Sequence, residues 1–191
     1  MTPTIRKTCK RYNTPTNAHF ITFSCFRRQP FLARDRSREW VLDALRKARE
    51  QHAFDLWAWV IMPEHVHLVI WPRAREYSIS AILASIKKPV TNAALRHVRK
   101  HSPEFLERMR DAQPNGKCSY RFWQRGGGYD TNLWSATPLW DKIHYIHRNP
   151  VRRGLATTAE AWLWSSCQDF LELRVPPIPL DRHSIPPLPD G

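Results

Sequence analysis

Hydrophobic positions along the first part of the chain change their spacing in a way that predicts one strand, one helix and two further strands. Residues 19–26 are rich in aromatic and β-branched side chains, whereas residues 35–51 place apolar side chains at helical spacing. Residues 53–62 are apolar on both faces, which is typical of a central strand. A Pro-Glu turn then leads into residues 65–71, which we expect to return as a paired strand.

The middle of the chain has helical spacing that two prolines interrupt. A helix is predicted to begin after Ser78, which can cap it, and Pro89 is expected to end or kink this helix. Residues 90–109 have helical spacing again and are strongly basic, and Pro103 is expected to divide them. Residues 111–117, which contain proline, asparagine and glycine, predict a loop.

The later part of the chain is predicted to add one strand and one helix. Residues 120–123 have the composition of a strand, and the glycines at 126–128 break it. A Thr-Pro pair at 137–138 predicts a helix start, with threonine as the cap and proline in the first turn. Because Pro150 disfavours helical geometry at Asn149, this helix is expected to end there. The order of elements predicts an α+β fold with helices packed on an antiparallel sheet.

Length and composition predict one domain with two extensions. We expect a basic N-terminal arm at residues 1–16, the domain at residues 17–173, and a proline-rich tail at residues 174–191 that is extended or disordered. The four cysteines form no Cys-x-x-Cys pair, so they predict reduced thiols rather than a zinc cluster or a disulfide framework. Neither a signal peptide nor an apolar run of membrane-spanning length is visible, which predicts a cytoplasmic protein.

The charge balance indicates what kind of partner the chain has. Lys and Arg number 30 against 17 Asp and Glu, which leaves a net charge of +13, and the basic residues are spread along the whole sequence. A globular domain with this imbalance usually faces a polyanion, so we expect nucleic-acid binding. A solvated basic surface is the alternative, and a DNA affinity that does not fall with salt would favour it.

Candidate chemistry lies in two short patterns. His65 and His67 alternate with Val66 in a predicted interior strand, so both imidazoles point to the same face, where they could bind a divalent metal. Tyr145 and Asn149 lie one helical turn apart and share a face. An ion held by the two imidazoles and the Asn149 amide oxygen could orient a phosphate for attack by Tyr145, which would leave a covalent phosphotyrosine. Surface histidines and an ordinary half-buried tyrosine are the alternatives.

The segments around these residues resemble a known family. Residues 62–68, Met-Pro-Glu-His-Val-His-Leu, resemble the His-hydrophobic-His (HUH) motif of single-tyrosine transposases of the insertion-sequence type. Residues 145–155 are similar to the Tyr-Ile-x-x-Asn-Pro-Val-x-x-Gly-Leu signature of the REP-associated tyrosine transposase branch. Phe-Trp-Gln at 122–124 and Trp-Ser-Ser at 164–166 match further landmarks of that branch, and the resemblance runs from residue 19 to residue 170.

The resemblance implies a fold, a reaction and a partner. The fold would be the ferredoxin-like sheet of HUH endonucleases, and the reaction would be Mg²⁺- or Mn²⁺-dependent cleavage and joining of single-stranded DNA beside a hairpin, through a 5′-phosphotyrosine. His65, His67 and Asn149 would be the metal ligands and Tyr145 the nucleophile. The protein would be nucleoid-associated, as a monomer or as a homodimer that exchanges helices. Glu64 departs from the asparagine common at this position; it could tune the site or merely cap the turn, and we expect the cap.

Basic residues near these motifs and along the basic helix are candidate DNA contacts. They are Lys87, Lys88, Arg96, Arg99, Lys100, Arg121, Arg125, Arg148, Arg152 and Arg153. A catalytically silent module that binds hairpin DNA or RNA would share them, and only the enzyme would form a covalent adduct. A zinc hydrolase is disfavoured, because apolar residues follow His67 where the His-x-His-x-Asp-His pattern needs Asp and His.

Overall fold

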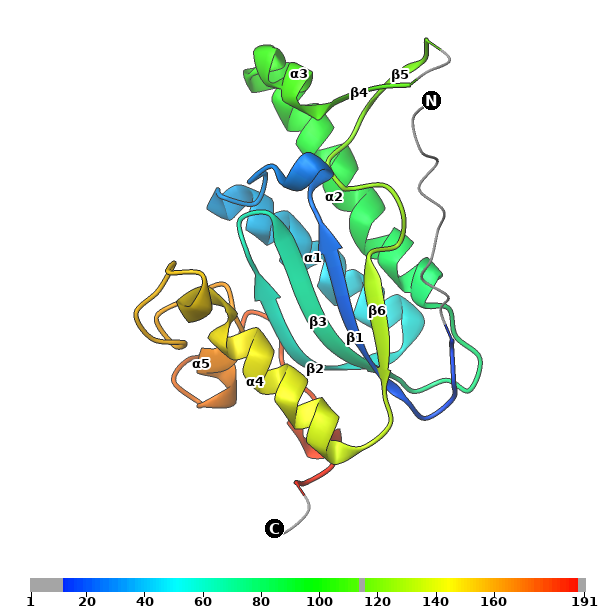
Figure 1. Ribbon diagram of the computed structural model, residues 1–191, viewed down its shortest axis with the longest axis vertical. Helices are drawn as coiled ribbons and strands as arrows, with labels where there is room; N and C mark the ends of the chain where they lie inside the picture. The colour runs from blue at the N-terminus through cyan, green and yellow to red at the C-terminus, as the bar shows by residue number, and fades with distance from the viewer. Residues whose placement is uncertain (1–11, 114–115, 189–191) are drawn as a thin grey trace.

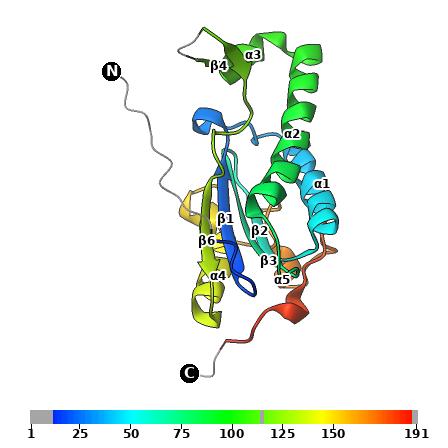
Figure 2. The same ribbon diagram turned by 90° about the vertical axis from the view of Figure 1, so that its right-hand side faces the viewer.

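The computed structural model describes residues 12–113 and 116–188, and its centre is a four-stranded antiparallel sheet with the order β2-β3-β1-β6. Its strands are β1 (Ala18–Ser24), β2 (Phe54–Ile61), β3 (His65–Pro72) and β6 (Tyr129–Leu133). Helices α1 (Asp35–His52) and α2 (Ile79–His101) cover one face, and α4 (Ala136–Arg152) covers the other (Figure 1, Figure 2). The predicted α+β class is confirmed.

The remaining elements are short. They are the 3-10 turns η1 (Phe26–Arg28), η2 (Pro103–Phe105) and η3 (Arg182–Ser184), the helices α3 (Leu106–Met109) and α5 (Cys167–Phe170), and the strands β4 (Arg110–Ala112) and β5 (Cys118–Tyr120). Helix α2 therefore ends just before Pro103, as predicted. In the part of the chain that the structure describes, no helix combines the length and the apolar character needed to cross a membrane.

Both faces of the sheet are buried. Ile21 and Phe23 of β1 join the larger apolar cluster beneath α1 and α2, whereas Phe20 joins a second cluster with Leu139 and Ile143 of α4. Side chains alternate between the faces of a strand, so neighbouring residues of β1 serve different clusters. All of β2 is buried for the same reason, which explains its apolar character on both faces.

The hydrophobic pattern does not predict β6, whose sequence Tyr-Asp-Thr-Asn-Leu is mostly polar. This strand lies at the edge of the sheet, and its pairing with β1 rather than its own pattern places it there. Gly128, directly before it, has a φ of +74°, and a Cβ at this position would lie 2.0 Å from the carbonyl oxygen of Thr22. The last glycine of the triplet therefore allows the chain to approach β1.

The segment after α3 forms a hairpin, and most of the loop predicted at residues 111–117 falls in the connection between its strands. Strands β4 and β5 pair in antiparallel fashion, and residues 114–115 of the connection lie outside the described residues. The strand predicted at 120–123 is correct only at its first residue, because β5 ends at Tyr120. Further on, Trp123 forms an isolated bridge with Cys25, which extends the pairing beyond the end of β1.

Of the two outcomes predicted for Pro89, a helix end is wrong, since α2 continues through it from Ile79 to His101. The Ser78 side chain caps this helix as predicted, accepting a hydrogen bond from the Ala81 amide at 3.2 Å. Pro89 itself is exposed, while Ile86 and Val90 on either side of it are fully buried in the core. Packing of this buried face therefore outweighs the hydrogen bond that the proline cannot make.

The predicted bounds of α4 are wrong at both ends. Its cap is Ser135 rather than Thr137, and the helix continues past Asn149 and Pro150 to Arg152. It ends in a Schellman motif, in which the amide of Leu155 donates to the carbonyl of Pro150 and that of Gly154 to Val151, each at 2.9 Å. Gly154 has a φ of +65°, as this motif requires. The Gly-Leu that closes the 145–155 signature is therefore the helix stop, and Pro150 lies inside the last turn.

The described part of the proline-rich tail, residues 174–188, is docked against the edge strand β2. The Leu56 amide donates to the Asp181 carboxylate at 2.8 Å, and the Asp181 amide donates to the Leu56 carbonyl at 3.0 Å. Trp57 Nε1 donates to Ser184 Oγ at 2.8 Å, and Ile178 is fully buried in the larger core cluster. The hydrogen bonds satisfy polar groups of the edge strand, and Ile178 adds apolar burial, so together these contacts outweigh the compositional signal.

Candidate active site

His65 and His67 lie side by side on β3, in the middle of the sheet. Antiparallel pairing with β1 places Ser24 opposite His65 and Thr22 opposite His67. Both imidazoles are buried, and their Nε2 atoms lie 2.9 Å apart. The prediction that the two rings share one face is confirmed.

Helix α4 brings Tyr145 and Asn149 to the same place. Asn149 is buried, and its side-chain amide nitrogen lies 3.2 Å from His67 Nε2. The Tyr145 ring meets the His67 ring edge-on, with 5.4 Å between the centroids, and meets Phe20 in the same way at 5.9 Å. The guanidinium of Arg152 lies 5.1 Å from the centroid of the Tyr145 ring. The two sequence patterns, one on a strand and one on a helix, therefore form a single site within one chain.

The Nδ1 atoms of both histidines have polar partners behind the site. His67 Nδ1 lies 2.7 Å from Thr22 Oγ1, and His65 Nδ1 lies 3.1 Å from Glu64 Oε1. The same Glu64 oxygen is 2.9 Å from an Arg153 guanidinium nitrogen. The expectation that Glu64 merely caps the turn is therefore wrong, because its carboxylate orients the His65 ring and pairs with Arg153.

Burial keeps both histidines neutral. Desolvation lowers the pKa of His67 to about 3, with smaller contributions in the same direction from His65 and Lys142. Desolvation also lowers the pKa of His65, although the Glu64 carboxylate opposes part of that effect. Neutral imidazoles offer a nitrogen lone pair, so these two side chains are ready to accept a hydrogen bond or to bind a metal at neutral pH.

The site fits a divalent cation in its choice and arrangement of donor atoms. Within residues 12–113 and 116–188, no three His, Cys, Asp or Glu side chains gather as a metal cluster, so the third donor beside the two imidazoles is an amide. The Asn149 Oδ1 atom is buried and has no hydrogen-bond partner. A flip of this amide exchanges its oxygen with the nitrogen now facing His67 Nε2. Two neutral imidazoles and one amide oxygen suit Mn²⁺, and also Mg²⁺ beside further oxygen donors.

These side chains open into a pocket of about 210 Å³ with a basic rim. We call it the histidine pocket, and it is lined by Thr22, Ser24, Arg28, His65, His67, Tyr145, Asn149, Arg152 and Arg153. Sequence analysis does not single out Thr22, Ser24 or Arg28 as site residues. Thr22 and Ser24 could be found only from the strand register opposite the histidines, and Arg28 follows them in η1.

The predicted DNA contacts divide between two places. Arg152 and Arg153 lie on the rim of the histidine pocket. A second hollow of about 480 Å³, which we call the basic cleft, lies between α2 and residues 120–127. Four candidates line this cleft: Lys87, Lys88, Arg121 and Arg125. The others, Arg96, Arg99, Lys100 and Arg148, are exposed but line neither hollow.

Ion pairs order part of the basic cleft. The Asp111 carboxylate accepts hydrogen bonds from Arg121 and from Arg125, the latter at 2.8 Å, and the hydrogen bond from Arg121 is the largest cause of the lowered pKa of Asp111. Lys87 Nζ donates to the Gly126 carbonyl at 3.0 Å. The hairpin β4–β5, α2 and the glycine-rich segment are thus tied together around the cleft.

Comparisons with known proteins place this geometry in context. The profile of the family described as “Transposase IS200 like” matches residues 13–148, well over half of the chain. A Haemophilus influenzae protein provisionally named a REP-associated tyrosine transposase is 24% identical over 139 residues, which cover 69% of this chain and 73% of that protein. A solved structure of a REP-associated tyrosine transposase bound to a REP hairpin has a TM-score of 0.67 and 21% identity, covering 90% of both chains. This likeness shows that the two proteins share a fold.

Proposed function

The chain belongs to the IS200-like transposase family, and on this basis we propose that it cleaves and rejoins single-stranded DNA beside a hairpin, with Tyr145 as the nucleophile. One observation carries the proposal: the Tyr145 ring packs on His67, whose Nε2 faces both His65 Nε2 and the Asn149 amide. A nucleophile and three candidate metal donors therefore meet in one basic-rimmed pocket. All four side chains belong to the same chain, and we propose that a monomer carries out the reaction.

The proposed reaction is a transesterification. Tyr145 Oη attacks the scissile phosphorus, and the bond from phosphorus to the 3′ oxygen breaks as the new phosphotyrosine bond forms. Water takes up the phenol proton and supplies the proton that the departing 3′ oxygen needs. Arg152, next to the Tyr145 ring, is placed to stabilise the negative charge on the attacking oxygen and on the phosphate. The phosphotyrosine ester conserves the bond energy, so a 3′ hydroxyl can reverse the reaction.

His65, His67 and Asn149 would hold a divalent ion, Mg²⁺ or Mn²⁺. When bound, such an ion supplies Lewis acidity toward the scissile phosphate. The protein's own part is orientation: Thr22 and Glu64 contact the Nδ1 atoms of the two rings and so keep the two Nε2 atoms turned toward each other, with that of His67 beside Asn149. Arg153 neutralises Glu64, so that the carboxylate does not repel the incoming phosphate.

Hairpin DNA is the proposed substrate class. The structurally similar protein is one bound to a REP hairpin, and this chain carries a net charge of +13 with a basic cleft besides its basic pocket. Lys87, Lys88, Arg121 and Arg125 would contact the backbone of the paired stem, and Arg152 and Arg153 the phosphates next to the cut. The exposed positions Arg96, Arg99, Lys100 and Arg148 would add long-range attraction.

The test uses end-labelled single-stranded oligonucleotides that contain a hairpin, incubated with the protein and Mn²⁺ or Mg²⁺ and separated under denaturing conditions. A retarded band that protease removes is the expected covalent adduct, and mass spectrometry should locate it on Tyr145. The matched control is an oligonucleotide of the same composition with the stem scrambled. Tight, salt-sensitive hairpin binding without any adduct across a pool of sequences would instead identify a catalytically silent binding module.

A further inference from the structure

The Trp-Ser-Ser segment, residues 164–166, does not line the histidine pocket, yet its last serine contacts α4. It runs along the free edge of β2, where the Ile61 amide donates to the Trp164 carbonyl at 2.8 Å and the Ser166 amide to the Trp59 carbonyl at 2.9 Å. Ser165 forms an isolated bridge with Val60. The segment therefore extends the sheet by a short stretch of antiparallel pairing.

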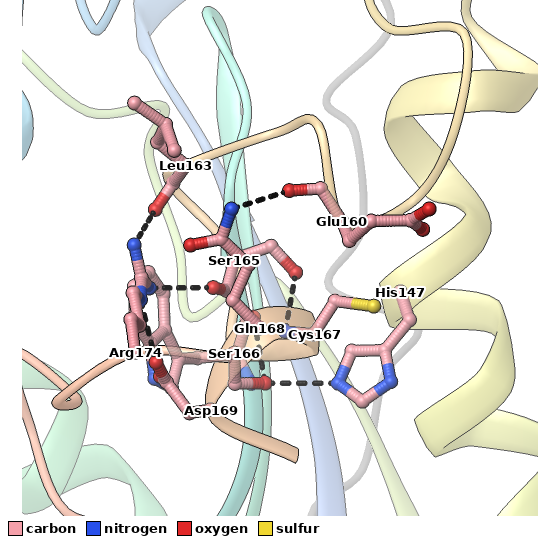
Figure 3. A network of polar contacts seen from close by, with 10 residues as sticks. His147, Glu160, Leu163, Ser165, Ser166, Cys167, Gln168, Asp169 and Arg174 are labelled. Carbon is pink, nitrogen blue, oxygen red and sulfur yellow. Dashed lines mark hydrogen bonds and ion pairs between the residues drawn. The ribbon is translucent and has the colours of Figure 1, made fainter. Parts of the chain in front are cut away.

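The segment is fastened on its other side by Arg174. The guanidinium of Arg174 donates to the carbonyls of Leu163 and Ser165 at 2.8 and 2.9 Å, and to the carboxylate of Asp169 at 2.6 Å (Figure 3). Ser165 and Asp169 are buried, which limits the access of water to the two contacts made with them, whereas Leu163 is exposed. Ser166 is thus held in place independently of α4.

From this fixed position, Ser166 bonds a histidine of α4. Its hydroxyl accepts from the Trp59 amide at 2.9 Å and donates to the Trp59 carbonyl at 3.2 Å. A hydroxyl has one hydrogen and two lone pairs, so one lone pair of Ser166 Oγ remains available. His147 Nε2 lies 3.0 Å from this oxygen (Figure 3). Ser166 is fully buried and His147 nearly so, and no water can replace this bond if it breaks.

His147 and the reactive pair occupy opposite flanks of α4. With ~100° per residue, His147 lies ~100° to one side of the buried Ile146, whereas Tyr145 lies ~100° and Asn149 ~60° to the other side. Apolar contacts of the helix with the sheet are not directional and resist such rotation weakly. If α4 rolls about its axis, one flank moves toward the sheet while the other moves away, so the roll that takes Tyr145 and Asn149 from His67 also displaces His147 from its bonding distance to Ser166.

We propose that Ser166 and His147 are positioning residues that prevent α4 from rolling and so hold Tyr145 and Asn149 against His67. The inference rests on the proposed function for its effect on cleavage, but not for its effect on the position of Tyr145. With side chains at ~5–6 Å from the helix axis, a roll of about 10° moves them by about 1 Å. A misplacement of that size costs about 10²-fold in rate when geometry controls the reaction.

The first experiment follows Tyr145 itself, by fluorine NMR of protein labelled with fluorotyrosine. The Tyr145 resonance is assigned by its loss in Tyr145→Phe. In His147→Leu, which keeps an apolar side chain but loses the bond to Ser166, we expect this resonance to shift or broaden. His147→Gln, whose amide can reach Ser166 Oγ, should restore it. The control is Gln168→Ala, which removes a 2.7 Å bond to the Glu160 carbonyl in the same region without touching α4 (Figure 3).

The second experiment measures adduct formation at saturating hairpin DNA. We expect His147→Leu to be slower by about 10- to 100-fold with unchanged hairpin affinity, and His147→Gln and Gln168→Ala to stay within a few-fold of the parent. If His147→Leu does not fold, the same measurements are made on Ser166→Ala, which removes the Ser166–His147 hydrogen bond by deleting the serine hydroxyl. An unchanged Tyr145 resonance, or equal rates in the folded Leu and Gln variants, would overturn the positioning role. Absence of adduct in the parent protein would overturn the proposed function alone, because the NMR comparison still stands.

Discussion

The histidine pocket and the basic cleft are both polar hollows, but the first is built around buried neutral groups and the second around exposed charged groups. In the pocket, His65, His67 and Asn149 are buried and neutral, and each contact depends on strand register or on helix rotation. In the cleft, Lys88 and Arg125 are exposed and charged. The pocket therefore depends on geometry, whereas the cleft depends on the number of charges.

This difference teaches how each region should respond to change. Short-range contacts between buried groups fail when one atom is lost or displaced, because no solvent is present to compensate. Exposed charges act over several ångströms, and their contributions to DNA affinity are roughly additive. The loss of one charge therefore removes only a small part of the total attraction. Pocket variants should thus abolish cleavage and spare binding, and cleft variants should weaken binding and spare the chemical step.

The largest difference between the effect on cleavage and the effect on hairpin binding is expected for Tyr145→Phe. This change removes the attacking oxygen while the ring still packs on His67 and Phe20, so adduct formation should fall by more than about 10⁴-fold. Hairpin affinity, measured by fluorescence anisotropy, should stay within about twofold. Tyr120→Phe, in the wall of the basic cleft, is the matched control and should still form the adduct. An adduct in Tyr145→Phe would place the nucleophile elsewhere.

Loss of a metal ligand should have the next largest effect. We expect His67→Ala to slow cleavage by about 10²- to 10³-fold, which corresponds to several kcal/mol of lost transition-state stabilisation. A chelator should abolish cleavage by the parent protein and leave hairpin binding intact, and added Mn²⁺ should restore cleavage. His144→Ala, on the exposed side of α4, serves as the control. Full activity in excess chelator would contradict the role of the pocket as a metal site.

Acid should destabilise the pocket side of the protein. Burial lowers the pKa of His67 to about 3 and that of His147 to about 4, against about 6.5 in the unfolded chain. Below pH 6.5 the unfolded state therefore takes up protons that the folded state does not. The free energy of unfolding therefore decreases as the pH is lowered. When the pH is lowered from 7 to 5, each histidine should reduce the free energy of unfolding by about 2 kcal/mol. Urea unfolding with chelator present measures this slope, and His147→Gln should make it shallower; an unchanged slope would contradict the lowered pKa.

The smallest effects are expected in the basic cleft. Lys88→Gln and Arg125→Gln should each weaken hairpin binding several-fold and reduce the slope of log affinity against log salt by about 1, with the rate at saturating DNA unchanged. Titrations over a range of salt concentrations provide the measurement, with Lys47→Gln on the exposed face of α1 as the control. If both cleft variants keep the parent protein's slope of log affinity against log salt, the stem of the hairpin DNA does not contact this cleft.

Local patterns in the sequence were enough to predict several elements and most of the site. A strand with His65 and His67 on one face, and a helix with Tyr145 and Asn149 on one face, follow from periods of two and 3.6 residues. Both pairs were therefore predictable without any tertiary information. The same holds for α1, which follows from helical spacing along its own length, and for the start of α2 at Ser78, whose capping signal lies within one helical turn.

Tertiary contacts decided the features for which local patterns gave the wrong result. The prolines at 89 and 150 disfavour helix locally, yet packing of the buried faces of α2 and α4 keeps both helices intact. The polar β6 is a strand only because β1 offers a free edge, and the proline-rich tail docks only because β2 does. In each case many weak contacts with a distant segment outweigh one local preference.

The sequence by itself determined the chemical groups, their pairing within single elements and the excess of positive charge. Only the tertiary structure decided that the strand pair and the helix pair meet, and that Ser166 bonds His147. The physical reason is range. Periodicity and capping act within one or two turns, whereas the meeting of groups about eighty residues apart depends on strand order, register and helix rotation, which the whole core determines at once.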